Sequence, residues 1–204
     1  MKKSIWSFKL STAALALIPA GVGINFVGKL LVSVLKAPLW LDSIGTILSA
    51  MLAGPIVGAI VGLLNNVVVA LTALDSMALV YALTQIGIGL VAGILAKTGF
   101  IKNIVRATLT GLIVGLTAVV ISTPLNIIFW GGQTGNLWGD AVFLAMEAAD
   151  YPMWLSSLAD EIVIDLPDKV IVTVIAYLIF VNLPKTLTSM YDSQSVEAFD
   201  ESDA

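Results

Sequence analysis

Long apolar segments, separated by short polar or glycine- and proline-containing stretches, make up most of the chain. A helix that crosses the hydrocarbon core of a bilayer needs roughly 17–25 mostly apolar residues. The hydropathy pattern predicts six helices, at residues 8–35, 42–53, 56–74, 76–96, 104–130 and 158–183. The second is short for a full crossing and stops at Gly54-Pro55, because the fixed φ of proline favours a turn or a helix start.

The segment between the last two predicted helices, residues 131–157, has a different character. It begins Gly-Gly-Gln-Thr-Gly-Asn and continues with aromatic residues placed among acidic ones. This pattern predicts a glycine-rich turn followed by a helix at the membrane interface, where an aromatic ring can keep one edge in water. Residues 191–204 are acidic and predict a disordered tail. We therefore expect a single membrane domain over residues 1–190.

Composition supports a membrane environment. Hydrophobic residues form 58% of the 204 positions and charged residues only 12%, and the mean hydropathy is +1.00. Soluble domains are about a quarter charged. The expected fold is an all-α, polytopic bundle of six transmembrane helices. Residues 15–28 are similar to a secretory signal, but hydrophobicity continues beyond them, so we expect this segment to be retained.

The positions of lysine and arginine predict the orientation, because positive charge near short loops stays in the cytoplasm. With the N-terminus inside, seven basic residues lie on the cytoplasmic side: Lys2, Lys3, Lys9, Lys97, Lys102, Arg106 and Lys185. The outer side then has three lysines, Lys29, Lys36 and Lys169, with nine acids. Both termini are expected to be cytoplasmic.

Residue types missing from the chain exclude several functions. Without cysteine or histidine, the chain has no disulfide, thiol nucleophile, histidine base or Cys/His zinc site. No Gly-x-x-x-x-Gly-Lys-Ser/Thr motif occurs, so the chain has no such route to ATP hydrolysis. The net charge of −4 argues against a nucleic acid partner. We expect no catalytic residue, no cofactor and no metal.

Polar residues within the predicted spans gather in their outer halves. An unpaired polar group in hydrocarbon is costly, so these side chains should face a protein interior or a water-filled cavity. The pattern predicts an outward-facing pocket. The candidate substrate-binding residues are Trp40, Asp42, Asn65, Asn66, Tyr81, Gln85, Asn126, Trp130, Asp165 and Asp168.

Each candidate also has a purely structural interpretation. The amides of Asn65, Asn66 and Gln85 can join helices by hydrogen bonds. Asp165 and Asp168 can lie at a wet helix entrance with Pro167 breaking the first turn. Trp40, Trp130 and Trp138 can be interface anchors. Asp42 can be the N-cap of the second helix.

Small residues recur at four-residue spacing, which lets helix backbones approach closely. The pairs are Ala16/Ala20, Gly58/Gly62, Gly89/Gly93 and Gly111/Gly115. Internal packing accounts for most such stripes, and a partner surface is the alternative for one of them.

Four segments together resemble a known family. They are Ala16-x-x-x-Ala20, Ala-Pro-Leu-Trp-Leu-Asp-Ser-Ile-Gly-Thr-Ile at 37–47, Ala-Gly-Pro-Ile-Val-Gly-Ala-Ile-Val-Gly at 53–62, and Asp-Leu-Pro-Asp-Lys at 165–169. Over nearly its whole length the chain resembles the substrate-specific S components of energy-coupling-factor (ECF) transporters, which take up vitamins across bacterial plasma membranes.

The resemblance implies a six-helix bundle that binds a vitamin near its outer surface. It implies as partners one transmembrane scaffold protein and two ABC ATPases, with Ala16 and Ala20 as the docking residues. Trp40, Asp42, Asp75 and residues 131–138 match the family's ligand-covering loops by position only.

The charge of the outer side bears on the ligand. Three lysines, no arginine and nine acids favour a neutral or weakly basic ring over an anion. We lean toward a compound similar to hydroxymethylpyrimidine or pyridoxine; pantothenate, cobalamin or another vitamin is the alternative. Two other classes remain open, a membrane sensor and a membrane enzyme that uses the carboxylates Asp160, Glu161, Asp165 and Asp168.

Overall fold

The computed structural model describes residues 11–72 and 74–191, which are helical apart from short connections and contain no strand. Ser11 caps the first helix by accepting a hydrogen bond from the Ala14 N–H at 3.1 Å. The elements in chain order are α1 (Thr12–Leu35), α2 (Ile44–Ala53), α3 (Pro55–Leu71), the 3-10 helix η1 (Ser76–Leu79), α4 (Ala82–Lys97), α5 (Ile104–Trp130), α6 (Leu137–Ala148), α7 (Met153–Asn182) and α8 (Lys185–Thr188).

All six predicted helices have counterparts, and the helix predicted within residues 131–157 is α6. Several boundaries differ. Helix α2 begins at Ile44 rather than at residue 42, and α3 ends at Leu71 rather than at residue 74. The fourth predicted helix divides into η1 and α4, because Asp75 caps a separate 3-10 turn by accepting the Met77 N–H at 3.0 Å. The last helix starts at Met153 rather than at residue 158, directly after Pro152, whose extended backbone suits the position before a helix. The basic cluster Lys2, Lys3 and Lys9 and residues 192–204 of the acidic tail lie outside the described residues.

Two helices, α1 and α5, are long and apolar enough to cross a membrane, a criterion that a core helix of a soluble protein can also meet. The helices α2, α3 and α4 are apolar but shorter. Helix α7 has 30 residues, and its N-terminal half carries several carboxylates.

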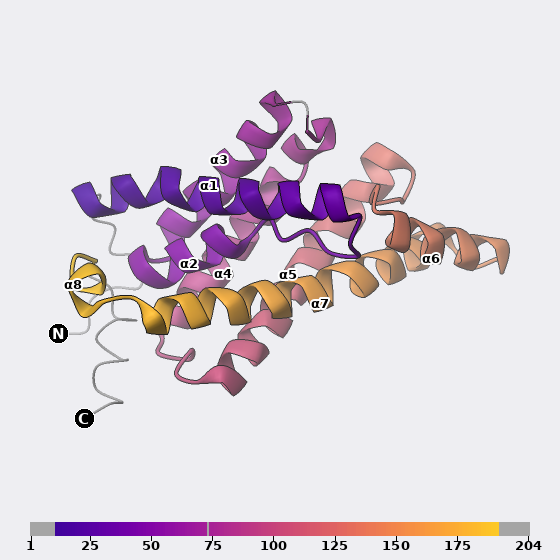
Figure 1. The fold of residues 1–204 in the computed structure, drawn as a ribbon. Coiled ribbons are helices and arrows are strands. Elements are labelled where there is room, and N and C mark those ends of the chain that lie inside the picture. Colours follow the sequence, from indigo (N-terminus) through magenta and orange to yellow (C-terminus); the bar gives the residue numbers. More distant parts are fainter. Residues whose placement is uncertain (1–10, 73, 192–204) are drawn as a thin grey trace.

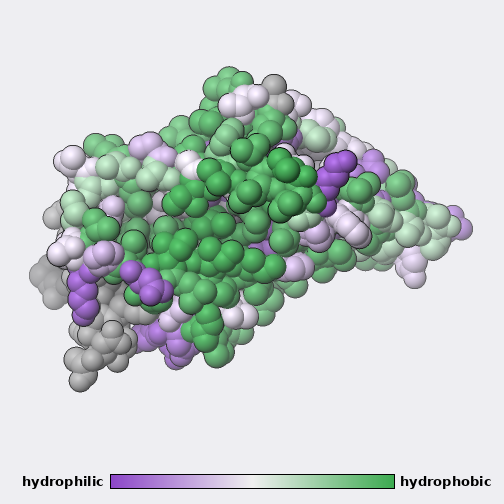
Figure 2. All heavy atoms as spheres, viewed as in Figure 1, coloured by the Kyte–Doolittle hydropathy of each residue, from purple (hydrophilic) through white to green (hydrophobic). Residues whose placement is uncertain are grey.

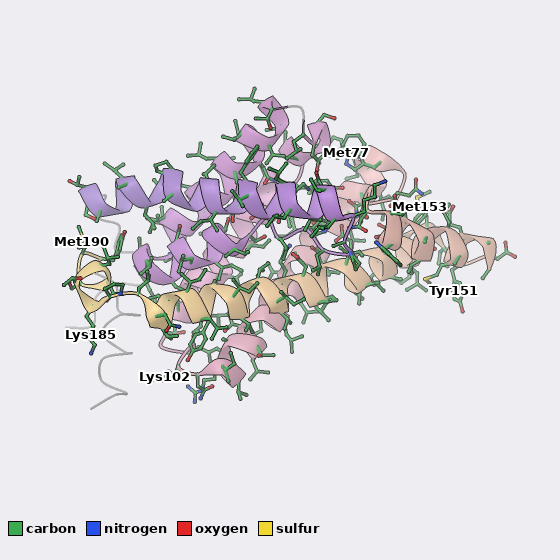
Figure 3. The ribbon with its side chains drawn as sticks, viewed as in Figure 1. Met77, Lys102, Tyr151, Met153, Lys185 and Met190 are labelled. Atoms are coloured by element: carbon green, nitrogen blue, oxygen red, sulfur yellow. The ribbon has the colours of Figure 1, made fainter. Side chains whose placement is uncertain are left out.

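The helices lie along one another in an elongated bundle. In Figure 1, α8 and the first turn of α1 lie at one end of the molecule and α6 lies at the other. Figure 3 shows Lys102 and Lys185 toward the α8 end, and Met77, Tyr151 and Met153 toward the α6 end. We call these the α8 end and the α6 end.

Glycines explain how closely the helices approach. A Cβ placed on Gly89 of α4 would lie 2.4 Å from the carbonyl carbon of Gly58 on α3, and one on Gly111 of α5 would lie 2.6 Å from the Cα of Val170 on α7. The three glycine pairs thus serve internal packing, as expected. The Ala16/Ala20 stripe differs because both alanines are exposed, as is Gly23 one turn further along α1.

Apolar side chains cover the outside of the bundle. Figure 2 shows a hydrophobic central band with hydrophilic residues toward the two ends. Exposed apolar residues include Val34 at 72%, Val120 at 70% and Ile128 at 71%. Charged residues such as Asp168 and Lys169 are buried instead. This distribution is the reverse of that in water-soluble domains and suits a hydrocarbon surrounding.

Candidate substrate-binding pocket

A lysine surrounded by carboxylates lies at the centre of the polar interior. The Lys169 Nζ on α7 lies 2.6 Å from Asp168 Oδ2, 3.2 Å from Asp165 Oδ1 and 3.8 Å from Asp42 Oδ1. Buried charges are tolerated when they are paired in this way. The interpretation of Asp165 and Asp168 as residues at a wet entrance is wrong, because α7 begins 12 residues before Asp165 and both side chains are buried. Pro167 lies inside α7 and does not break its first turn.

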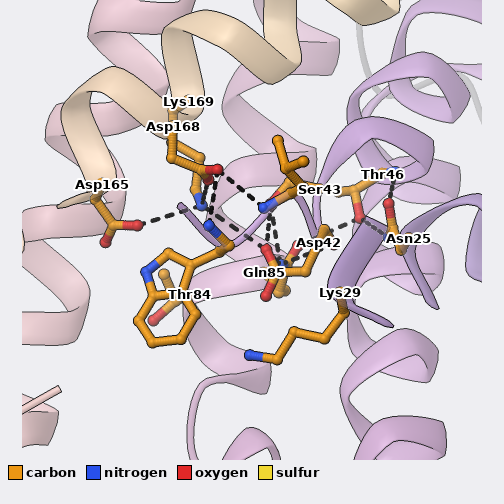
Figure 4. Close-up of polar contacts among 12 residues, drawn as sticks. Asn25, Lys29, Asp42, Ser43, Thr46, Thr84, Gln85, Asp165, Asp168 and Lys169 are labelled. Carbon is orange, nitrogen blue, oxygen red and sulfur yellow. Dashed lines mark hydrogen bonds and ion pairs between the residues drawn. The ribbon is translucent and has the colours of Figure 1, made fainter. Parts of the chain in front are cut away.

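Asp168 also holds the connection between α1 and α2. Its Oδ1 accepts hydrogen bonds from the backbone N–H groups of Trp40 at 3.0 Å and Leu41 at 2.9 Å (Figure 4). The Leu41 backbone has a positive φ of 50°, and the Leu41 carbonyl packs closely on Gly28 of α1. Residues 37–43 therefore enter the bundle as non-helical chain, and their backbone donors are satisfied by a side chain of α7.

Asp42 is the next residue of this connection and joins it to α4. Its Oδ1 accepts hydrogen bonds from Ser43 Oγ at 2.9 Å and from Gln85 Nε2 at 3.0 Å. The Lys169 ammonium group lies 3.8 Å from the same oxygen, so the buried carboxylate of Asp42 has a compensating charge. The N-cap interpretation is wrong, because Ser43 occupies the N-cap position of α2.

Asn25, which the sequence analysis did not select, extends this network to α1. Its Oδ1 accepts the Gly45 N–H at 2.6 Å and its Nδ2 donates to Thr46 Oγ1 at 2.8 Å. Thr46 Oγ1 in turn donates to Gln85 Oε1 at 3.3 Å. An amide within a mainly apolar helix is itself a signal for such a contact.

A second chain of polar contacts joins α4, α5 and α7. The Tyr81 hydroxyl donates to Asn126 Oδ1, and Asn126 Nδ2 donates to Glu161 Oε1. Asn126 thereby positions Tyr81 and Glu161 from behind. Thr84 Oγ1 and Ser122 Oγ are 2.9 Å apart beside it.

The two asparagines of α3 behave differently from each other. Asn66 Nδ2 donates to the Ala78 carbonyl at 2.8 Å and ties η1 to α3, as the structural interpretation expects. Asn65 Nδ2 donates to Asn66 Oδ1 at 3.0 Å. The Oδ1 of Asn65 is buried, and no donor among the described residues reaches it.

Lys29 of α1 pairs with the connection before η1. Its Nζ lies 3.0 Å from Asp75 Oδ2 and 4.4 Å from the centroid of the Trp40 ring. The ammonium group is thus held by a carboxylate and by an aromatic face.

These residues enclose an inner pocket of about 50 Å³. Seven of the ten candidate residues line it: Trp40, Asp42, Asn65, Asn66, Tyr81, Gln85 and Asp165. The structure also brings to it residues that were not candidates, among them Lys29, Asp75, Thr84, Glu161 and Lys169.

Three candidates do not line the inner pocket. Asn126 and Asp168 lie behind it and position its walls. Trp130, at the last position of α5, is tilted against Phe129 with ring centroids 6.4 Å apart.

An outer groove of about 370 Å³ adjoins the inner pocket and shares Lys29, Trp40, Asp75 and Thr134 with it. Trp138 lines this groove and donates from Nε1 to the Lys36 carbonyl at 3.1 Å. Thr134 is held by hydrogen bonds from its N–H to Asp140 at 3.0 Å and from its hydroxyl to Asp160 at 3.0 Å. The glycine-rich turn is thereby attached to α7 and forms one wall of the groove.

Together, the pocket and the exterior define an all-helical protein with a charged, hydrogen-bonding cavity inside an apolar surface. Comparison of the chain with protein-family models, curated proteins and solved structures finds no match.

Proposed function

We propose that this chain is the substrate-binding S component of an ECF-type importer in a bacterial plasma membrane, and that it captures a vitamin or vitamin precursor from outside. The observation that carries the proposal is the inner pocket, which combines paired charges, amides and an aromatic ring beneath an outer groove. A few convergent polar groups in a concave site are typical of small-molecule binding.

The proposed membrane arrangement has six spans, α1, α2, α3, α4, α5 and α7, with α6 at the outer interface. The α8 end is cytoplasmic in this arrangement, which places Lys97, Lys102, Arg106 and Lys185 inside.

The connection between α1 and α2 supports a transport role for this bundle. Helix α2 has 10 residues and is about 15 Å long, so it covers only about half of the hydrocarbon core. The remaining depth is covered by residues 37–43, which enter the bundle without helical structure. Non-helical backbone at membrane depth is tolerated where it is buried in protein or lines a cavity, and transporters use such interruptions to bind substrates.

The exposed stripe of Ala16 and Ala20 supports the proposed docking role of α1. Small side chains let a partner helix approach closely. The partner module would consist of one transmembrane scaffold protein and two ABC ATPases. The ATPases would supply the energy for transport, because this chain has no nucleotide-binding loop of its own.

The residues that line the pocket support a ligand similar to hydroxymethylpyrimidine or pyridoxine. Both lysines of the inner pocket already have carboxylate partners, so neither is free to receive an anion such as pantothenate. The amides of Asn65, Asn66 and Gln85 suit the hydrogen-bonding edge of a heterocyclic ring.

Native mass spectrometry of the chain, purified in detergent from its own host, tests the proposal. We expect a bound molecule of vitamin mass, together with a membrane scaffold and two ATPases. A folded sample that carries neither a small molecule nor these proteins would contradict the proposal and favour the sensor or enzyme classes.

A further inference from the structure

We propose that the ligand carries a cationic, donor-rich head group of amidine or aminopyridinium type, which the inner pocket binds through Glu161, Asp165 and Asn65, while its uncharged body lies in the outer groove. This inference rests on the proposed function, because it assigns the chemistry of the ligand to the same pocket.

The first observation is a shortage of positive charge in the inner pocket. Four carboxylates line it, from Asp42, Asp75, Glu161 and Asp165, against the two ammonium groups of Lys29 and Lys169. Lys29 pairs with Asp75, and Lys169 is shared among three carboxylates, including Asp168 behind the wall.

Glu161 is the carboxylate without a cation. Its hydrogen-bond donor is the neutral amide of Asn126, and within the described part of the chain no ammonium group lies at ion-pair distance from it. Asp165 lies one turn further along α7 and lines the same pocket. Both side chains are buried, at 2% and 4% exposure. A buried carboxyl group is neutralised either by a proton or by a cationic partner, and a cationic ligand would be such a partner.

The second observation is independent of charge. Asn65 is fully buried and lines the same pocket, and its Oδ1 has no donor among the described residues. A buried acceptor without a partner is destabilising, because it has lost its hydrogen bonds to water and gained none in the protein. Asn65 Oδ1 therefore lacks an N–H or O–H donor and Glu161 lacks a cation, and an amidinium or aminopyridinium edge provides both.

The dimensions favour a small head group. A water-sized group requires roughly 10–15 Å³ of such space, so the pocket of about 50 Å³ accepts about four of them. An amidine group is of this size. Across residues 11–72 and 74–191, no three carboxylates are grouped to hold a metal ion, which favours an organic cation.

The outer groove suits the rest of the ligand. It is larger, at about 370 Å³, and its lining includes Val32, Leu74, Met77, Leu137 and Trp138. Lys29, Asp75 and Trp40 lie where the two spaces meet. A ring attached to the head group would pass beside Trp40 and contact apolar side chains.

Benzamidinium and benzamide test the inference, because they share a shape and differ in charge. Their dissociation constants are measured by ligand-observed NMR or calorimetry on the full chain in detergent. We expect benzamidinium to bind at least tenfold more tightly than benzamide. We expect Glu161→Gln to remove this difference, because glutamine can still accept from Asn126 but has no charge. Glu147→Gln is the matched control: Glu147 is exposed on α6, and its substitution should leave the difference unchanged.

The possible failures can be told apart. If benzamide binds as tightly as benzamidinium and Trp40→Ala weakens both, the pocket binds ligands but the cationic head group is overturned. If neither probe binds and the folded chain retains no small molecule in native mass spectrometry, the proposed function falls together with this inference. If the Glu161→Gln variant keeps the preference for benzamidinium, the assignment to this carboxylate is wrong.

Discussion

At the scale of single residues, the polar interior depends on a few side chains that each serve several partners. Lys169 neutralises carboxylates from two segments of the chain, and Asp168 both pairs with it and accepts two backbone N–H groups. Removing one member of such a buried network leaves the others unpaired, which costs more than the lost contact itself.

Substitutions of Asp168 test how much this buried network stabilises the protein. Asp168→Ala should lower the free energy of unfolding by about 3 kcal/mol, because the Trp40 and Leu41 N–H groups lose their acceptor and Lys169 loses its nearest carboxylate. Asp168→Asn should cost less than half as much, since the amide oxygen can still accept from the connection. Reversible unfolding in mixed detergent micelles measures both. Equal losses of unfolding free energy in the two variants would contradict this account. They would show that Asp168 stabilises the protein mainly through its ion pair with Lys169 and not through the backbone N–H groups.

At the scale of elements, the connection over residues 37–43 is decided by its neighbours. The helix α1 approaches it through Gly28, where a Cβ would lie 2.0 Å from the Leu41 carbonyl oxygen. The same helix exposes Ala16, Ala20 and Gly23 on another face. One helix therefore has a face that shapes the pocket and a face available to a partner.

A pair of glycine variants tests the face that shapes the pocket. Gly28→Ala should displace the connection and weaken ligand binding by at least tenfold, because the added methyl group meets backbone rather than a flexible side chain. Gly23→Ala should leave binding unchanged and stabilise α1 by up to about 1 kcal/mol, because a Cβ there meets nothing within 4 Å. Binding of the ligand identified by mass spectrometry and the unfolding midpoint are the measurements. Similar behaviour of the two variants would contradict this account.

Bulky substitutions test the other face. Ala16→Trp and Ala20→Trp should abolish uptake in cells while the isolated subunit binds its ligand nearly as tightly as before, because the added ring blocks close approach of a partner helix. Leu15→Trp is the control, since Leu15 is 52% exposed on a neighbouring face of α1. Uptake of labelled ligand and binding to purified protein are compared. Loss of both in the alanine variants would indicate misfolding instead of lost docking.

At the scale of the whole molecule, apolar side chains face outward and charged side chains face inward. This distribution suits a hydrocarbon surrounding. The proposed orientation in it has the α8 end in the cytoplasm and the pocket open to the outside. Because the sequence contains no cysteine, a cysteine introduced at one position is the only thiol available for labelling, so the orientation can be tested directly.

Single cysteines report the orientation. In intact cells, a membrane-impermeant thiol reagent should label Glu147→Cys, at the α6 end, and should reach Lys102→Cys only after the membrane is opened. Both positions are exposed. Labelling of both in intact cells, or the reverse pattern, would overturn the proposed topology.

The sequence by itself determined most of the helices, and most of the candidate residues that it predicted line the inner pocket. Hydropathy over 20-residue windows is a local property, so α1, α3 and α5 could be predicted within a few residues. The glycine-rich turn and the aromatic residues after it predicted that α6 exists but not where it begins or ends. The cost of polar groups in hydrocarbon singled out residues such as Asn65 and Gln85, and both line the inner pocket.

Only the tertiary structure decided the partners of those residues. The hydrogen bond from the Trp40 N–H to Asp168 joins positions 128 residues apart in the sequence. A local sequence pattern cannot predict a contact between positions so far apart. Lys169 at the centre, Asn126 behind the wall, the free oxygen of Asn65 and the cation-deficient Glu161 all follow from how the helices pack. The physical reason is that hydropathy specifies which faces are buried, whereas packing specifies which buried groups meet.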